Sequence, residues 1–383
     1  MNAFITAISA FLPGEAVEND ALDEYLGKTG RISARTRQMI LAGNGIQTRY
    51  YAIDPATGKT SFTNARLAAA AVRRLGFDEE SKEKRLECLC CGTSSADQIM
   101  PGHASMVHGE LGGGPCEVIS TSGICLSGIT AMKYAAMSVS SGMSKNAVAT
   151  GSELASTYMR QDFFLAAAER KKKNGVGKQR HLAFSFEADF LRWMLSDGAG
   201  AVLIEPEPAS GKLSLQINWI ELISHAHRLE TCMYAGALKQ EDGSLVGWRD
   251  CIRTGKQEGV FTIKQDARLL NKEIIRTMVG QSLPLVIDKY ALKPKNIDWF
   301  LPHYSSDFFR EPLKVGLRKI GFPLPDEKWF TNLRTKGNTG SASFYIMLEE
   351  LFSSGRLRQG DRILGMIPES GRFSVGWVLL TVV

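Results

Sequence analysis

Several features that would place a chain in a special class are missing from this sequence. It has 383 residues, 44% hydrophobic and 22% charged, which excludes a disordered or low-complexity chain. No apolar run reaches the roughly eighteen residues of a membrane span, so we expect none. Residues 1–5 lack the basic and apolar regions of a signal peptide, and we expect a cytoplasmic protein. The 46 basic and 40 acidic residues nearly balance, which disfavours a nucleic-acid partner and suits an acidic protein or a phosphate-bearing ligand.

Cysteine is too scarce and too unevenly spaced for a disulfide framework. There are seven, an odd number, and Cys88, Cys90 and Cys91 lie too close together for normal pairing. A metal site is the alternative, but no second ligand pair lies at zinc spacing, so we expect no metal. Residues 86–91 are apolar apart from Glu87, which predicts a buried strand with reduced thiols.

Hydrophobic patterning divides the chain into alternating strands and helices. Strands are predicted over 3–10, 86–91, 116–121 and 146–150, and helices over 62–75 and 125–141. This alternation indicates an α/β fold. A charged stretch within 168–182 predicts a solvated insertion near 155–190, with the docking of an acidic partner as the alternative.

An internal repeat is the most informative feature. Gly142 lies 17 residues after Cys125 and ends a predicted helix, and Gly355 lies 17 residues after Asn338 in the same way. An apolar strand follows each of these glycines. A second apolar strand ends each half, over 198–204 in the first half and over 376–383 in the second. The sequence therefore predicts two similar α/β halves, residues 1–210 and 211–383, with Cys125 and Asn338 at equivalent helix N-termini.

Three polar residues stand at positions where chemistry is expected. Cys125 precedes a helix, whose positive end lowers a thiol's pKa and favours thiolate; an inert core cysteine is the alternative. His303 ends a short apolar strand, where α/β folds hold catalytic groups, although a structural histidine is also common there. Asn338 is either a helix N-cap or a functional amide.

These residues carry a resemblance to a known family. The motifs that resemble ketoacyl-acyl-carrier-protein synthase III and its thiolase-fold relatives are Cys125, Pro302-His303, 337–339, 196–201 and 370–376. The resemblance spans the whole chain and implies a five-layered αβαβα arrangement, a homodimer and no cofactor. An asparagine in the last motif, rather than a second histidine, separates this group from the elongating synthases.

The resemblance also implies a reaction. Cys125 would take an acyl group from an acyl thioester, with an oxyanion hole made by the backbone N–H groups of Cys125 and Gly371. His303 and Asn338 would then stabilise the enolate of a malonyl- or β-ketoacyl-carrier-protein during Claisen condensation, in fatty acid, polyketide or alkylresorcinol/cyclohexanedione-type biosynthesis. Acyl transfer to an alcohol or amine, with His303 as general base, and a non-catalytic partner subunit are the alternatives.

Departures from the family bear on the acyl donor. Members primed by acetyl-coenzyme A hold it with a tryptophan and two arginines, which match Met39, Gly43 and Ser156 here. We therefore expect acyl carrier protein as the donor. The basic residues that follow His303 predict its docking face, with a solvated helix face as the alternative; they are Arg310, Lys314 and Arg318, with Lys319 beside them.

Further departures concern the acyl chain. Met100 matches the family's residue that reaches into the partner's acyl pocket, and its flexible side chain leaves room for a medium or long chain. Glu369 replaces an aromatic residue and Arg372 a glycine, either as a structural ion pair or to contact a polar acyl chain. We place Glu369 and Phe373 with Met100 in the predicted pocket, a pattern that favours secondary metabolism.

Overall fold

The computed structural model describes residues 2–28, 33–77, 85–163, 190–256 and 259–383. Most of the insertion predicted near 155–190, with its charged stretch at 170–175, lies outside these residues. Within the described part of the chain, no helix is both long enough and apolar enough to cross a bilayer.

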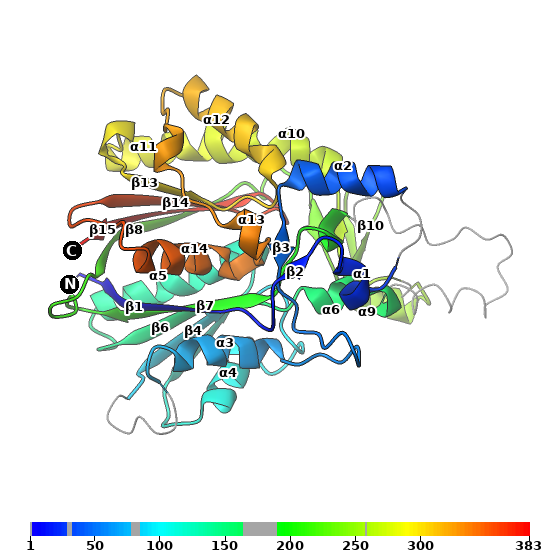
Figure 1. The fold of residues 1–383 in the computed structure, drawn as a ribbon, viewed down its shortest axis with the longest axis horizontal. Helices are drawn as coiled ribbons and strands as arrows, with labels where there is room; N and C mark the ends of the chain where they lie inside the picture. The colour runs from blue at the N-terminus through cyan, green and yellow to red at the C-terminus, as the bar shows by residue number, and fades with distance from the viewer. Residues whose placement is uncertain (1, 29–32, 78–84, 164–189, 257–258) are drawn as a thin grey trace, which may run out of the picture.

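Helices and strands form five layers (Figure 1). The upper layer holds α10 (Ala267–Thr277), α11 (Leu283–Tyr290) and α12 (Arg310–Lys319), and the lower layer holds α3 (Asn64–Arg73) and α4 (His103–Leu111). Between the two strand layers lie α5 (Ser127–Ser140) and α14 (Ser343–Ser353). This is the αβαβα thiolase arrangement that the sequence predicted.

Nine strands form one hydrogen-bonded order, β13-β14-β15-β8-β1-β7-β6-β4-β5. Two residue pairs, Phe4↔Gln216 and Ile5↔Leu215, join β8 to β1 and so connect the two strand layers. The strands are β1 (Phe4–Phe11), β4 (Cys88–Gly92), β5 (Glu117–Thr121), β6 (Ala147–Glu153), β7 (Gly198–Glu205), β8 (Leu215–Ser224), β13 (Trp299–Pro302), β14 (Arg362–Pro368) and β15 (Ser374–Val382).

The two strand layers repeat one topology, as the internal repeat predicted. In the first, β1-β7-β6-β4 has antiparallel pairs and then a parallel β6–β4 pair. In the second, β8-β15-β14-β13 has antiparallel pairs and then a parallel β14–β13 pair. The proposed division at 210/211 falls between β7 and β8 and stays a prediction.

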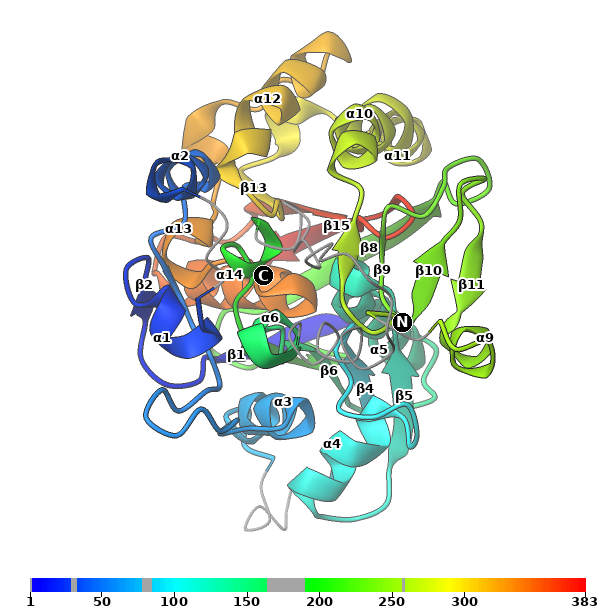
Figure 2. The same ribbon diagram turned by 90° about the vertical axis from the view of Figure 1, so that its right-hand side faces the viewer.

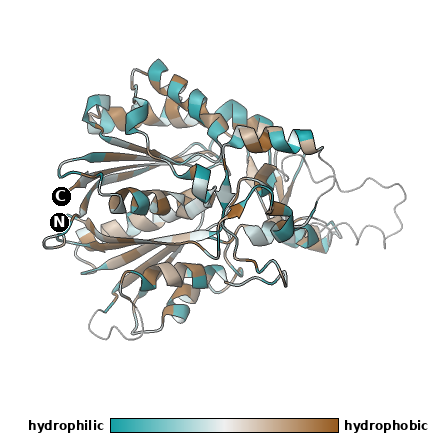
Figure 3. Cartoon of the chain, in the orientation of Figure 1, coloured by the Kyte–Doolittle hydropathy of each residue, from teal (hydrophilic) through white to brown (hydrophobic). Residues whose placement is uncertain are grey.

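Local sequence explains the elements nearest the site. Thr63 caps α3 by accepting the N–H of Arg66 at 3.2 Å, and the helix buries a face of alanines and Leu67. The inner helices α5 and α14 are largely apolar because both of their sides face strands (Figure 3). All of β4 is buried, and its cysteines are free thiols, which confirms the buried-strand interpretation.

The smaller elements gather at the end of the molecule away from the two termini (Figures 1 and 2). This end faces the viewer in Figure 2, and it is where the candidate site lies. The elements are β2 (Val17–Glu18), α1 (Leu22–Leu26), α2 (Ala34–Asn44), β3 (Thr48–Arg49), α6 (Ser156–Met159), β9 (Met233–Tyr234), β10 (Ala237–Lys239), β11 (Leu245–Gly247), α9 (Trp248–Arg253), β12 (Lys264–Gln265) and α13 (Leu333–Lys336).

Candidate active site

Cys125 sits on a sharp turn between β5 and α5. Gly123 has φ 135° and Ile124 has φ 49°, a left-handed conformation that a β-branched residue rarely adopts. A single 3₁₀ turn, Ile124–Leu126, then leads directly into α5. This backbone places the partly buried thiol of Cys125 at the helix N-terminus, as the sequence predicted.

The electrostatic surroundings of Cys125 differ from the expectation. Burial, followed by the negative charges of Glu153 and Glu369, raises the pKa of its thiol above the ordinary value of 9.0. Its own backbone N–H acts in the opposite direction, but more weakly. The prediction that the helix N-terminus lowers this pKa is therefore wrong, because desolvation and two carboxylates outweigh the helix end. At neutral pH the side chain of Cys125 is therefore a protonated thiol.

His303 follows β13 at the carboxyl end of the strand. Its backbone N–H donates to the carbonyl of Met366 at 2.8 Å, which continues the β13–β14 pairing and fixes the residue. The side chain is buried, and burial lowers the pKa of its imidazole to about 4. His303 is therefore neutral at pH 7, and a neutral imidazole has one nitrogen to donate a hydrogen bond.

Asn338 is held from three sides. Its backbone N–H donates to Met194 at 2.9 Å, and its carbonyl accepts the N–H of Ser196 at 2.9 Å. Its side-chain Oδ1 accepts the N–H of Gly340 at 3.0 Å, just before the 3₁₀ turn that leads into α14. The interpretation of Asn338 as a helix N-cap is therefore wrong: Thr339 is the N-cap of the 3₁₀ turn, and Asn338 closes a side-chain turn onto the residue two places on. That turn uses only Oδ1, and the Nδ2 group donates to none of the described residues.

Glu153 is a buried carboxylate that the sequence analysis did not single out. Oε1 accepts the N–H and hydroxyl of Ser94 at 3.0 and 2.7 Å and the N–H of Ser341 at 3.3 Å, and Oε2 accepts the hydroxyl of Ser95 at 2.8 Å. Burial raises its pKa, while these hydrogen bonds act to lower it. The acidic residue at the end of β6 was the available signal. Glu153 joins the loop after β4 to the turn before α14.

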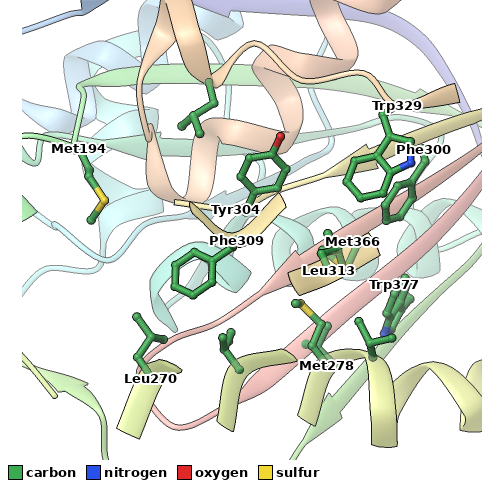
Figure 4. Close-up of a cluster of buried hydrophobic side chains, with 14 of the residues drawn as sticks. Met194, Leu270, Met278, Phe300, Tyr304, Phe309, Leu313, Trp329, Met366 and Trp377 are labelled. Atoms are coloured by element: carbon green, nitrogen blue, oxygen red, sulfur yellow. The ribbon is translucent and has the colours of Figure 1, made fainter. Parts of the chain in front are cut away.

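One cavity of about 360 Å³ brings Cys125, His303, Asn338 and Glu153 together. Its remaining surface is mainly apolar. In Figure 4, Leu270 of α10 and Met278, the residue that follows α10, lie on one side and Phe309 and Tyr304 on the other. The apolar lining residues are Ile124, Leu191, Met194, Leu195, Met233, Ile263, Leu270, Ile274, Ile275, Met278, Phe309 and Leu313. The arrangement offers a thiol, two neutral hydrogen-bonding side chains and room for a hydrocarbon chain.

Two family models match the chain, one in each half. The N-terminal domain of beta-ketoacyl synthases matches residues 53–209, and the C-terminal domain of 3-oxoacyl-[acyl-carrier-protein] synthase III matches residues 287–378. A curated relative, the beta-ketoacyl-[acyl-carrier-protein] synthase III of Clostridium perfringens, is 24% identical over 380 residues. The aligned part covers 99% of this chain and 99% of the relative. The chain is a ketoacyl synthase III-like enzyme of the thiolase fold. Its reaction class is that of an acyltransferase-type condensing enzyme.

Solved structures share the fold over the full length. AbyA1, a tetronic acid condensing enzyme, has a TM-score of 0.72 at 17% identity and covers 99% of both chains. A variant of OleA from Xanthomonas campestris has a TM-score of 0.73 at 19% identity, over 100% of this chain and 98% of its own. The synthase III of Aquifex aeolicus has a TM-score of 0.67 at 20% identity, over 99% of both chains.

The second expected oxyanion donor of this synthase III-like enzyme is already engaged. Gly371 is buried, and its N–H donates to a carboxylate oxygen of Glu369. Glu369 and Arg372 do not form the ion pair that one interpretation proposed. Instead Glu369 accepts backbone N–H groups, and the Arg372 side chain donates through Nε to the carbonyl of Leu229 at 2.9 Å.

The three residues expected in the acyl pocket do not line the cavity. Met100 is 79% exposed, beside the cis peptide bond to Pro101. Phe373 is 1% exposed and belongs to the core cluster of Val375 and Trp377, and Glu369 turns its carboxylate to its own loop. The apolar wall comes instead from α10 and α12, which lie more than 140 residues after Cys125. A reach of Met100 into a partner's pocket stays a prediction.

The predicted docking residues are only partly available at the surface. Lys314 contacts Asp326 at 2.7 Å and Glu311 at 3.0 Å, and its ammonium lies over the ring of Trp329. Arg310 also lies over Trp329, 3.9 Å from Asp326. Arg318 is exposed on the same helix.

The positions matched to coenzyme A contacts offer no positive charge. Met39 is 67% exposed on α2, and nothing lies within 4 Å of a side chain at Gly43. Ser156 is buried, and both its N–H and its hydroxyl donate to the carboxylate of Asp197.

Proposed function

We propose that this enzyme loads an acyl group onto Cys125 and condenses it with a malonyl- or β-ketoacyl-carrier-protein. One observation carries the proposal: Cys125, His303 and Asn338, from distant parts of the sequence, line a single cavity with an apolar wall. A thiol supplies the nucleophile, and two neutral donors suit the enolate that forms as carbon dioxide leaves a malonyl group. A β-ketoacyl group forms the same kind of enolate by losing its C2 proton to a base.

The order of events follows from the protonation states. Cys125 gives up its proton as its sulfur attacks the thioester carbonyl, and the departing thiol carries that proton away. His303, neutral because it is buried, and the free Nδ2 group of Asn338 donate to the carbonyl oxygen of the second thioester. The enolate carbon then attacks the acyl group on Cys125, and the sulfur is released with a new carbon–carbon bond formed.

The cavity supports a medium-length acyl chain. A cavity of about 150 Å³ holds benzene, so one of about 360 Å³ takes on the order of ten carbon atoms. The wall of Leu270, Met278 and Leu313 offers no charge to a polar chain. We therefore propose a saturated chain of medium length as the group carried by Cys125.

We propose acyl carrier protein as the donor, on the absence of positive charge at Met39, Gly43 and Ser156. Arg318 and Lys319 are the exposed cations of α12, and we assign Arg318 to the encounter, because Arg310 and Lys314 already contact Asp326. Rim charges of this kind act mainly on the association rate.

We also propose a homodimer formed through the edge strand β5. Its far side pairs with no strand of the described chain, and an open edge favours pairing with a second chain. The segment with exposed Ile99 and Met100 lies beside it, since the Ala104 N–H donates to the Ser120 hydroxyl of β5 at 2.8 Å. The cytoplasmic location likewise stays a prediction.

The test is intact-mass measurement after incubation with carrier proteins bearing chains of about two to sixteen carbons. The proposal expects one acyl mass per chain on Cys125, fastest near ten carbons, and release of a longer product when malonyl carrier protein is added. An acyl group that passes to an added alcohol or amine, and not to malonyl carrier protein, would favour simple acyl transfer instead.

A further inference from the structure

The loop that follows β14 is wrapped around the carboxylate of Glu369. This side chain is 7% exposed and accepts the backbone N–H groups of Gly371, Arg372 and Ser374, the last two at 3.2 and 3.1 Å. Successive backbone N–H groups that converge in this way form an anion-binding concavity. Here the bound group is part of the chain itself. Burial raises the pKa of Glu369, and the three N–H donors, which favour its ionised form, act to lower it.

The Gly371 N–H in this concavity is the one that the family resemblance implies as the second oxyanion donor. Gly371 packs against the turn that carries Cys125: a Cβ atom added to Gly371 would lie 2.6 Å from Cδ1 of Ile124. Its carbonyl accepts the N–H groups of Cys232 and Met233 at 2.7 and 3.2 Å, which hold the loop from its other side. The loop therefore lies beside the turn of Cys125, while the N–H of Gly371 donates to Glu369.

The charge of Glu369 is also not neutralised by a cation. None of the ion pairs found among the described residues includes it, and Arg372 directs its side chain to Leu229. A negative charge near Cys125 opposes the negative oxyanion that forms when the thiol attacks a thioester. Glu369 therefore removes one oxyanion donor and adds a like charge.

We propose that Glu369 is a positioning residue that competes with the substrate oxyanion for the N–H of Gly371, and so slows acylation of Cys125. This inference rests on the proposed function. In the step concerned, the bond between the Cys125 sulfur and the acyl carbon forms, the bond from that carbon to the donor sulfur breaks, and the donor thiol leaves with the proton. The oxyanion can use the Gly371 N–H only after the carboxylate has released it.

Two reactions of the same sulfur separate this role from a general effect on Cys125. Acylation by a small acyl-N-acetylcysteamine thioester passes through an oxyanion, whereas alkylation by iodoacetamide does not. Changes in thiolate fraction or access alter both rates, so the acylation-to-alkylation ratio reports the oxyanion hole alone. Both rates are measured by intact mass on the full-length protein.

The variants are Glu369→Gln and Glu369→Ala, with exposed Glu207→Gln as the matched control. A single oxyanion donor contributes roughly 10²- to 10³-fold to rate, which sets the ceiling. We expect the ratio to rise about tenfold in Glu369→Ala and a few-fold in Glu369→Gln, whose neutral amide oxygen still accepts an N–H. The control should match the wild type.

Each outcome of these rate measurements either supports or overturns the proposed role of Glu369. An unchanged or lower ratio in Glu369→Gln, in protein with wild-type melting behaviour, overturns the inference and leaves Glu369 as a structural anchor of the loop. If Glu369→Ala does not fold, Glu369→Gln alone decides. If iodoacetamide labels Cys125 but no thioester or carrier protein acylates it even in the wild type, the proposed function fails, and this inference fails with it.

Discussion

The two halves of the molecule share one strand order but use their equivalent ends differently. In the first half, a 3₁₀ turn before α5 presents Cys125, and in the second, a 3₁₀ turn before α14 follows Asn338. In the proposed reaction one half supplies the nucleophile and the other supplies the hydrogen-bond donors. The comparison teaches that the framework is repeated while the position of the functional residue is not: Cys125 lies inside its 3₁₀ turn, and Asn338 lies before its own.

Two buried acidic residues, Glu153 at the end of β6 and Glu369 directly after β14, also differ between the two halves. Glu153 is held by serine groups from two loops, including the Ser341 N–H from the other half, so it joins the halves. Glu369 is held by the backbone of its own loop. Both raise the pKa of Cys125, so the two halves act together on one thiol.

Loss of the nucleophile is the largest expected effect. Cys125→Ala should abolish the acyl adduct completely, whereas Cys116→Ala, which changes a half-buried thiol beside β5, should retain it. Intact mass followed by peptide mapping checks both. An adduct that persists in Cys125→Ala would assign the nucleophile elsewhere and remove the asymmetry between the halves.

The second half is tested by variants that separate the backbone contact of Asn338 from the proposed hydrogen-bond donors. Asn338→Asp keeps an oxygen that can accept the Gly340 N–H but loses the Nδ2 donors. We expect it, and His303→Ala, to accept an acyl group and to condense about 10²- to 10³-fold more slowly, as for the loss of one oxyanion donor. Single-turnover product formation is the measurement. Full condensation activity in Asn338→Asp would leave Asn338 with a structural role only, through its bond to the Gly340 N–H.

The pH dependence of alkylation tests the joint effect of the two acids. Only the thiolate reacts, and the pKa of Cys125 is raised above 9.0. The iodoacetamide rate should therefore still rise about tenfold per pH unit through pH 9, where an ordinary thiol approaches its plateau. Glu153→Gln removes one negative charge, so it should lower this pKa and raise the rate at pH 8. A wild-type plateau below pH 9 would contradict the electrostatic account.

The smallest expected effect concerns the carrier-protein encounter. Arg318→Glu should lower the rate of loading from acyl carrier protein a few-fold at low salt, and added salt should reduce the difference. The matched control is Lys295→Glu, which changes an exposed lysine just before the N-terminal end of β13. Loading from a small thioester should not change in either variant. Equal loss in both would indicate a nonspecific charge effect.

Strands and helices near the site could be predicted from sequence because their burial leaves a clear pattern. The apolar run 86–91 became β4, and the repeat correctly indicated the two inner helices. The predicted equivalence of Cys125 and Asn338 is wrong, because Cys125 lies two residues before α5, whereas Asn338 lies five residues before α14 and Ser341 takes the matching place. The cavity wall could not be predicted in this way. Leu270 and Leu313 look like ordinary core residues of amphipathic helices, and only the packing of α10 near α12 gives them a cavity to line.

The electrostatics of the site were also beyond the sequence. A helix start before Cys125 suggested a lowered pKa, but burial of the thiol, followed by the charges of Glu153 and Glu369 from distant segments, raises it. The resemblance at Gly371 suggested a backbone N–H that could bind the oxyanion. In the structure this N–H donates to Glu369, and a sequence motif does not contain the side-chain conformation of Glu369 on which that bond depends.

The most direct measurement of the central claim is a single turnover that starts from acylated enzyme. Protein carrying an acyl group on Cys125 is mixed with malonyl carrier protein, and both the adduct and the product are followed by mass. The account predicts that the adduct on Cys125 decays at the rate at which a product two carbons longer appears, and that both processes slow together in Asn338→Asp. An adduct that decays to the free acid while no extended product forms, in the wild type, would contradict it.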